Sequence, residues 1–201
     1  MKDELDKQLC EKFPKMFRDR YAPMSQTCMC WGFDHGDGWF NILRALCSNI
    51  QHHIDWRRQQ RASALQFNRC LERALKGDTA GLIWYHTHGL EGGPAPWTLK
   101  RVEEDIADAK YRNEPDAVPQ VLVTQVKEKF GTLRFYYYGG DEKIDGMVRM
   151  AESMSALTCE ECGAPGKSRS GGWVRTLCDT HAGGREVDED DEDDEDDSIE
   201  P

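Results

Sequence analysis

The feature that most constrains the fold of this 201-residue chain is a set of three cysteines and one histidine near its C-terminal end. Residues 157–181 read LTCEECGAPGKSRSGGWVRTLCDTH, which gives the spacing C-x2-C-x15-C-x2-H. Each two-residue spacer lets two ligands hold one cation from a tight turn, and the segment between the pairs is long enough for a β-hairpin. The sequence therefore predicts a zinc-binding module with four ligands, Cys159, Cys162, Cys178 and His181.

This ligand set predicts a structural role for the metal. Three thiolates and one imidazole complete the tetrahedral shell of Zn²⁺ and leave no position for an activated water. Gly163 suits the turn around the metal, and Gly171 with Gly172 suits the tip of a hairpin. A disulfide with a spare thiol is the alternative, but a reducing compartment disfavours it and it leaves His181 unexplained. We expect residues 158–185 to form a zinc-ribbon or treble-clef-like module.

The acidic charge of the chain is concentrated at its C-terminal end. Residues 188–197 are ten consecutive acids, and twelve of the 37 acidic residues lie after residue 185. The other 25 nearly balance the 26 Lys and Arg residues. Like charges at this density repel one another and bury nothing, so residues 186–201 are predicted to be a disordered acidic tail. The tail either keeps the protein soluble or acts as a polyanion that imitates nucleic acid or covers a basic face.

Hydrophobic periodicity predicts an α+β body over residues 1–157. Apolar residues about four apart indicate helices within residues 1–113, including one or two helices between Trp39 and Gly77. Within that region, GLIWYHTH at 81–88 favours a strand, and Thr98 favours the start of a helix that runs to Asn113.

A β-hairpin and a further helix follow in the sequence. Alternation of Val, Thr, Phe and Tyr on both sides of Phe130–Gly131 predicts a two-stranded hairpin over 118–140. Apolar spacing then predicts a helix over 141–157, directly before the cysteine motif. The expected fold is thus a helical N-terminal body, a β-hairpin and a C-terminal zinc module.

Two further groups of reactive side chains suggest an enzymatic alternative. Cys28-x-Cys30 and His86-x-His88 would each place two ligands on one face of a strand, where they could form a second metal site. The glycine-rich segment WGFDHGDGW offers Asp34, His35 and Asp37, which suit Mg²⁺ binding or acid–base catalysis in a nuclease or other hydrolase. The structural alternative is buried thiols, hydrogen-bonded histidines and a polar turn between two buried tryptophans, and we favour the turn.

The loop between the two ligand pairs carries the candidate contact residues. Basic side chains beside an aromatic ring can meet the phosphates and bases of nucleic acid, although a solvated hairpin explains them equally well. These candidates are Lys167, Arg169, Trp173 and Arg175. A second basic group, Arg57, Arg58 and Arg61, lies within the long helical segment.

The sequence contains no membrane signal. No window approaches the roughly eighteen apolar residues that span a bilayer, and MKDELDKQLCEKF lacks the apolar core of a signal peptide. We expect a cytoplasmic protein without a membrane partner.

Three segments carry a resemblance to a known group of proteins. VTQVKEKFGTLRFYYYGG, TCEECGAPGKSRSGGWVRTLCDTH and CMCWGFDHGDGW are similar to segments of uncharacterised proteins encoded by tailed bacteriophages and prophages, and the likeness covers most of residues 1–182. The resemblance implies the cytoplasm of an infected bacterium as the setting, and it implies no activity.

These observations together predict a non-enzymatic phage accessory protein with a structural zinc module. Its expected partner is a host or phage protein or nucleic acid that belongs to nucleic-acid handling. The alternatives are a metal-dependent nuclease or hydrolase and an acidic nucleic-acid mimic that inhibits a host defence or transcription protein.

Overall fold

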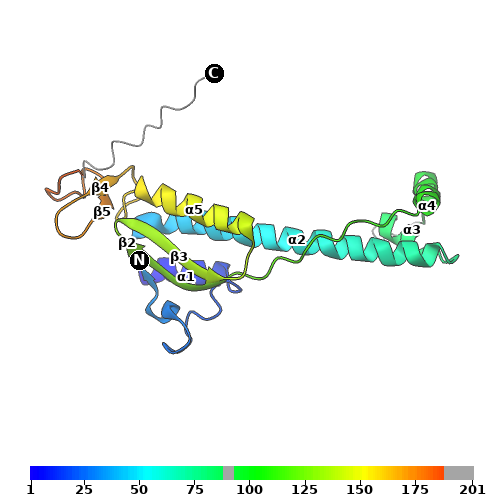
Figure 1. Ribbon diagram of the computed structural model, residues 1–201, viewed down its shortest axis with the longest axis horizontal. Coiled ribbons are helices and arrows are strands. Elements are labelled where there is room, and N and C mark those ends of the chain that lie inside the picture. The colour runs from blue at the N-terminus through cyan, green and yellow to red at the C-terminus, as the bar shows by residue number, and fades with distance from the viewer. Residues whose placement is uncertain (88–92, 188–201) are drawn as a thin grey trace, which may run out of the picture. The chain divides into compact units, whose positions relative to one another are not determined.

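The computed structural model describes residues 1–87 and 93–187, and these residues form two compact units (Figure 1). The first unit contains Met1–Ile54 and the chain from Pro119 onward, and the second contains Asp55–Val118. Helices and small sheets are both present, which confirms the α+β class. The units divide the chain differently from the predicted domains, because residues 158–185 belong to the same unit as the β-hairpin.

The first unit is built around a three-stranded sheet. Its strands are β1 (Phe33–Asp34), β2 (Leu122–Lys129) and β3 (Thr132–Tyr138), in the order β1-β2-β3. β1 runs parallel to β2, and β2 runs antiparallel to β3. The helices of this unit are α1 (Asp3–Lys12), the beginning of α2 (Phe40–Ala74) and α5 (Glu142–Ala156). Their apolar faces share a core that includes Trp39, Leu43, Ile50, Leu133 and Ile144.

α5 covers β3 and also binds its backbone. Asp141 caps the helix by accepting a hydrogen bond from the Ile144 N–H at 3.1 Å. Ser155 Oγ accepts from the Leu133 N–H at 2.8 Å, and Glu152 accepts from the Phe135 N–H at 3.0 Å. Side chains of the helix thus satisfy backbone donors that an edge strand would otherwise leave unpaired.

α2 is one continuous helix of 35 residues, which answers the question that the sequence left open between Trp39 and Gly77. It contributes residues to both units, since the unit boundary follows Ile54.

Among the described residues, no helix is both long enough and apolar enough to cross a lipid bilayer.

Within its described part, the second unit has helices as its regular elements, and the chain after Asp108 is irregular. The C-terminal part of α2 packs against α3 (Ala80–Thr87) and α4 (Pro96–Asp108) around a core of Phe67, Leu71, Leu82 and Val102. The predicted strand over 81–88 is therefore wrong, because packing against Phe67 and Leu71 decides the conformation of a short apolar run that periodicity alone leaves ambiguous. α4 begins before the predicted Thr98, which is buried inside the helix, and it ends at Asp108.

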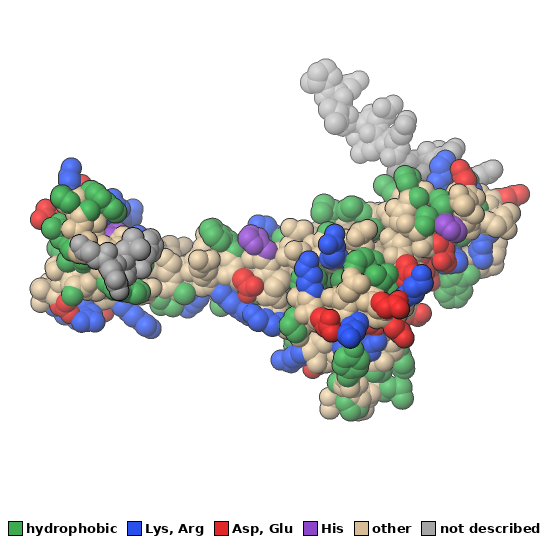
Figure 2. Space-filling model, turned by 180° about the vertical axis from the view of Figure 1, so that it is seen from behind, with side chains coloured by type: hydrophobic (Ala, Val, Ile, Leu, Met, Phe, Trp, Pro, Cys, Tyr) green, Lys and Arg blue, Asp and Glu red, His purple; other side chains and the backbone are tan. Residues whose placement is uncertain are grey.

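The acidic tail is described for its first two residues. The Ser170 N–H donates to the Glu186 carbonyl at 3.0 Å, and Val187 forms a β-bridge with Arg169. The remainder of the predicted tail, 188–201, lies outside the described residues. In the space-filling view, both acidic and basic side chains occur on the visible face, in line with the near balance of charge before residue 186 (Figure 2).

The two-residue turn between β2 and β3 has an unusual residue, Phe130, at its first central position. Phe130 and Gly131 both have positive φ angles, 52° and 77°, between the paired residues Lys129 and Thr132. Two positive φ values in a two-residue loop are the mark of a type I′ turn, whose first central position favours Asn. Phe130 is 72% exposed, so burial does little to offset the strain of its backbone.

Replacing this residue should stabilise the fold. We expect Phe130→Asn to raise the free energy of unfolding by about 1 kcal/mol, since Asn tolerates the left-handed conformation. For a chain of this length, that corresponds to a rise in Tm of roughly 2–4 °C, measured by circular dichroism during thermal unfolding. A fall in Tm of similar size would show that Phe130 makes contacts that stabilise the turn.

Candidate metal centre

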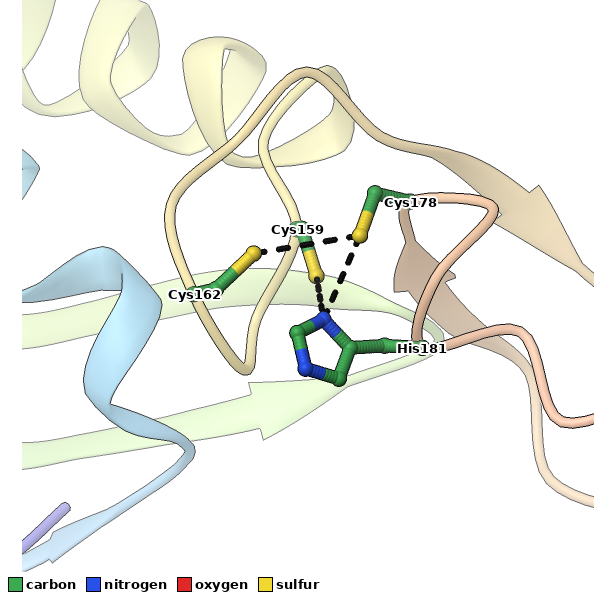
Figure 3. Close-up of side chains that lie close together, drawn as sticks. All are labelled: Cys159, Cys162, Cys178 and His181. Carbon is green, nitrogen blue, oxygen red and sulfur yellow. Dashed lines mark hydrogen bonds between the residues drawn. The ribbon is translucent and has the colours of Figure 1, made fainter.

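The four predicted ligands come together near the C-terminal end of the described chain (Figure 3). The ligand atoms of Cys159, Cys162, Cys178 and His181 all lie within 4.8 Å of one another. They are the one group of three or more Cys, His, Asp or Glu side chains within residues 1–87 and 93–187 that is close enough to share a metal ion. The cluster can therefore hold a metal ion.

Three of the six separations between ligand atoms in the cluster are close to the edges of a tetrahedral zinc site. Bonds of about 2.3 Å to sulfur and 2.0–2.1 Å to nitrogen give S···S edges of about 3.8 Å and S···N edges of about 3.6 Å. The Cys162 and Cys178 sulfurs are 3.8 Å apart, and His181 Nδ1 is 3.7 Å from the Cys159 sulfur and 3.2 Å from the Cys178 sulfur. A tetrahedral ion of the size of Zn²⁺ fits these distances.

Two tight turns bring the ligand pairs together. The Gly163 N–H donates to the Cys159 carbonyl at 2.8 Å, and Gly163 has a φ of 76°, the left-handed conformation expected of it. At the second pair, the His181 N–H donates to the Cys178 carbonyl at 3.0 Å. The strands β4 (Lys167–Arg169) and β5 (Arg175–Leu177) form the hairpin between the pairs.

Hydrogen bonding in the cluster favours thiolate at two of the cysteines. Burial raises the pKa of the Cys178 thiol, but the backbone amide and imidazole of His181, with the neighbouring thiols, outweigh burial and lower this pKa to about 6. At Cys159, burial also opposes ionisation, and backbone N–H donors around the sulfur lower its pKa. A hydrogen bond with the Cys178 sulfur raises the pKa of His181. Thiolates are the form in which cysteine binds metals.

The glycine-rich segment 34–38 packs directly against the first ligand turn, residues 158–160, and we call it the seat of the candidate metal centre. The Gly38 N–H donates to the Glu160 carbonyl at 2.7 Å, and the Gly36 N–H donates to the Glu160 carboxylate at 2.9 Å. Trp39 Nε1 donates to the Thr158 carbonyl at 2.8 Å. A Cβ atom on Gly38 would lie 2.1 Å from the Cys159 carbonyl oxygen. The two glycines are therefore required by the close approach of two backbones.

The reactive side chains of the same segment have separate surroundings. Asp37 accepts from the Lys2 N–H at 2.8 Å and forms an ion pair with the Lys2 ammonium at 3.0 Å. His35 is buried and donates from Nδ1 to the Gly36 carbonyl at 2.7 Å, and its Nε2 has no partner in the described part of the chain. Asp34 is exposed in β1, in register with Lys127. The structure does not gather Asp34, His35 and Asp37 around one point.

Three of the four other candidate ligands, Cys28, Cys30 and His86, are not on strands. Cys28 and Cys30 lie in a 3₁₀ helix (Cys28–Trp31), so the strand that would have placed them on one face is absent there. His86 lies in α3 and pairs with Asp105 at 2.7 Å. His88 lies outside the described residues. The expectation that Cys28 and Cys30 share one face of a strand is thus wrong. His86 lies in a helix where a strand was predicted, and this helix, α3, ends at Thr87.

The four candidate contact residues have two different roles in the hairpin. Lys167 and Trp173 are exposed. Arg169 is buried and forms an ion pair with Asp179, and Arg175 donates to the Glu160 carboxylate at 2.9 Å and to Glu161 at 2.5 Å. The two arginines therefore hold the module together from within, which leaves Lys167 and Trp173 accessible to a partner.

A cleft of about 720 Å³ lies beside the metal module, within the first unit. Its lining includes Asp34 from β1, Lys127 and Phe130 from the β2–β3 hairpin, and Trp173 and Arg175 from the module. Trp173 is one of the contact residues predicted from the sequence, and Phe130 is not. The signal that could have identified Phe130 is a large aromatic residue at the turn position that ordinarily holds Asn.

The close seat of the metal module predicts a strong effect of one methyl group. Gly38→Ala should lower the free energy of unfolding by about 3 kcal/mol or more, because two backbones must move apart to admit the Cβ atom. Gly146→Ala in α5 is the matched control, since its Cβ meets nothing within 4 Å, and it should raise stability by up to about 1 kcal/mol. Equal urea-unfolding midpoints for the two variants would contradict the close packing of the segment 34–38 against the first ligand turn.

The burial of His35 predicts a pH-dependent component of stability. Burial lowers its pKa from 6.5 to about 4, so the unfolded chain takes up a proton at pH values where the folded chain does not. This component is complete above pH 6.5 and is lost as the pH falls towards 4, by a total of about 3 kcal/mol. His35→Gln should flatten the urea-unfolding profile over this window, whereas the exposed control His52→Gln should not. Parallel profiles for wild type and His35→Gln would refute the assignment.

Comparisons with known proteins give no relative for this chain. No family model matches it. No curated protein and no solved structure matches it either. Its function is therefore argued from the geometry of the site.

Proposed function

We propose that this protein is a non-enzymatic binding protein whose C-terminal module is held in its folded form by a structural Zn²⁺ ion. The observation that carries the proposal is the four-ligand cluster, in which Cys162 and Cys178 have the sulfur separation of a tetrahedral zinc site. Three thiolates with one imidazole favour Zn²⁺ over Mg²⁺ or Ca²⁺, which prefer oxygen ligands.

The structural role of the zinc follows from the completeness of its ligand set. Four protein ligands leave no coordination position at which a water could be activated. The module also needs the ion, because its own sheet consists of two three-residue strands. Zinc contributes on the order of 10 kcal/mol to the folding of small modules of this kind, which is more than such a sheet gains by burial.

Binding is the function that this arrangement supports best. The ion would tie the two ends of the β4–β5 hairpin to the first ligand turn, which contacts the segment 34–38 through Glu160, and the hairpin exposes Lys167 and Trp173. Of the three groups that could serve catalysis, Asp37 forms an ion pair with Lys2 and His35 is buried, and only Asp34 is exposed. The resemblance to proteins of tailed bacteriophages supplies the proposed setting, which is the cytoplasm of an infected bacterium and a partner involved in nucleic-acid handling.

The proposal predicts one zinc per chain and its loss on removing a ligand. Purified protein should contain one equivalent of zinc by mass spectrometry of the metal, and Cys178→Ser should retain far less than one equivalent. Cys28→Ser is the matched control, since Cys28 is also half-buried and lies outside the cluster, and it should keep the full equivalent. Wild-type protein without zinc would refute the proposal, and loss of zinc from Cys28→Ser would contradict a single four-ligand site.

A further inference from the structure

We propose that the cleft beside the zinc module binds single-stranded nucleic acid, with unstacked bases lying against Phe130 and Trp173. This inference rests on the proposed function, because the zinc module supplies one wall of the cleft. The cleft volume of about 720 Å³ lies in the range of sites that enclose small molecules, and it is large enough for a nucleotide unit.

Phe130 is presented at a cost to the fold. It lies at the tip of the β2–β3 turn with a φ of 52°, and 72% of it is exposed. A bulky residue in the left-handed region is an outlier, and such outliers concentrate at functional sites. The structure gains little from burying this ring, so a ligand that covers it accounts for its presence.

Trp173 is exposed but fixed in place. It is 65% exposed, and its indole Nε1 donates to the Glu128 carboxylate at 2.8 Å. The other oxygen of the same carboxylate accepts from the Gly131 N–H at 2.6 Å, directly beside Phe130 in the turn. One carboxylate thus anchors the indole of Trp173 and the backbone of the turn that carries Phe130, so the positions of the indole and of this turn are set before a ligand arrives. Preorganised aromatic rings lose little conformational freedom on binding.

The charges of the cleft leave cationic groups for phosphate. The Glu160 carboxylate is engaged by Arg175 and by the Gly36 N–H, and Glu128 by the donors named above. Lys129 is exposed with its ammonium 5.3 Å from the centre of the Phe130 ring, and Lys127 lines the cleft next to it. Among the described residues, neither lysine forms an ion pair within 4 Å, although Asp34 lies in register with Lys127. Proteins that bind single strands commonly stack the bases on aromatic rings and hold the phosphates with nearby lysines.

Stacked duplexes do not fit this arrangement, because paired bases do not offer their faces to side chains.

The cleft also depends on the position of the zinc module next to the β2–β3 turn. Thr176 Oγ1 donates to the Gly131 carbonyl at 2.7 Å, and Gly131 forms a β-bridge with Arg175. The wall that carries Trp173 is thereby joined to the turn that carries Phe130.

The test is fluorescence anisotropy at low salt with labelled ten-nucleotide oligothymidylate and oligouridylate, and with a ten-base-pair DNA duplex. Zinc-loaded wild-type protein should bind at least one single strand at least tenfold more tightly than the duplex. Trp173→Ala and Phe130→Asn should each weaken that binding by about tenfold. The Phe130→Asn variant is informative because we expect its fold to be as stable as wild type or more so.

Matched controls separate this site from general surface exposure. Trp31→Ala removes a tryptophan that is also 65% exposed, and Tyr138→Ala removes an aromatic residue that is 74% exposed; neither residue lines the cleft. Both variants should bind as wild type does. Lys129→Gln should reduce the salt dependence of binding.

Four results would overturn the inference. The first three are the absence of single-strand binding by zinc-loaded protein, equal or tighter binding of the duplex, and equal weakening by the controls. Uridine monophosphate that competes as well as the oligonucleotide would also overturn it, in favour of a free nucleotide. Zinc content is measured on the same samples, so failure of the cleft with one zinc per chain leaves the proposed function intact. Absence of zinc refutes the proposed function itself.

Discussion

The close contact between the segment 34–38 and the first pair of metal ligands is the constraint on which the first unit depends. Gly38 lies so near the Cys159 carbonyl that no side chain can stand between them, and Glu160 binds this segment through both its backbone and its carboxylate. The same carboxylate receives Arg175 from the hairpin. One acidic residue thus joins the seat, the ligand turn and the hairpin, and a metal that fixes the ligand turn also fixes the surface built on it.

The surface next to the metal centre shows where the chain departs from locally favourable choices. Phe130 occupies a backbone conformation that suits Asn or Gly, whereas the positive φ angles beside Trp173 belong to Gly171 and Gly172, which tolerate them. Locally disfavoured residues in an otherwise consistent fold are expected at functional sites. The ligand cluster and the cleft belong to one account in our proposal, in which the ion would hold the module in place and the module would complete a binding surface.

The sequence predicted the parts of this structure that depend on local pattern. The spacing of the four ligands brings them together in the structure, and the alternating residues around Phe130–Gly131 form β2 and β3. It failed where tertiary contacts decide: residues 81–87 are helical because Leu82 packs in a helical core, a preference that a run of eight residues does not encode. The role of Asp34, His35 and Asp37 was also ambiguous. A glycine-rich polar turn can pack against another backbone or form an active site. Which of the two it does here is decided by its contact with Glu160, 122 residues beyond Gly38, which local sequence does not reveal.

The central claim is that one tetrahedral zinc, ligated by Cys159, Cys162, Cys178 and His181, holds this module on its seat. Zinc X-ray absorption spectroscopy on the full-length protein tests it most directly, because the spectrum reports the number and type of ligand atoms. The account predicts three sulfurs at about 2.3 Å and one nitrogen at about 2.0 Å. A shell with fewer than three sulfurs, or with an oxygen ligand from water, would contradict it.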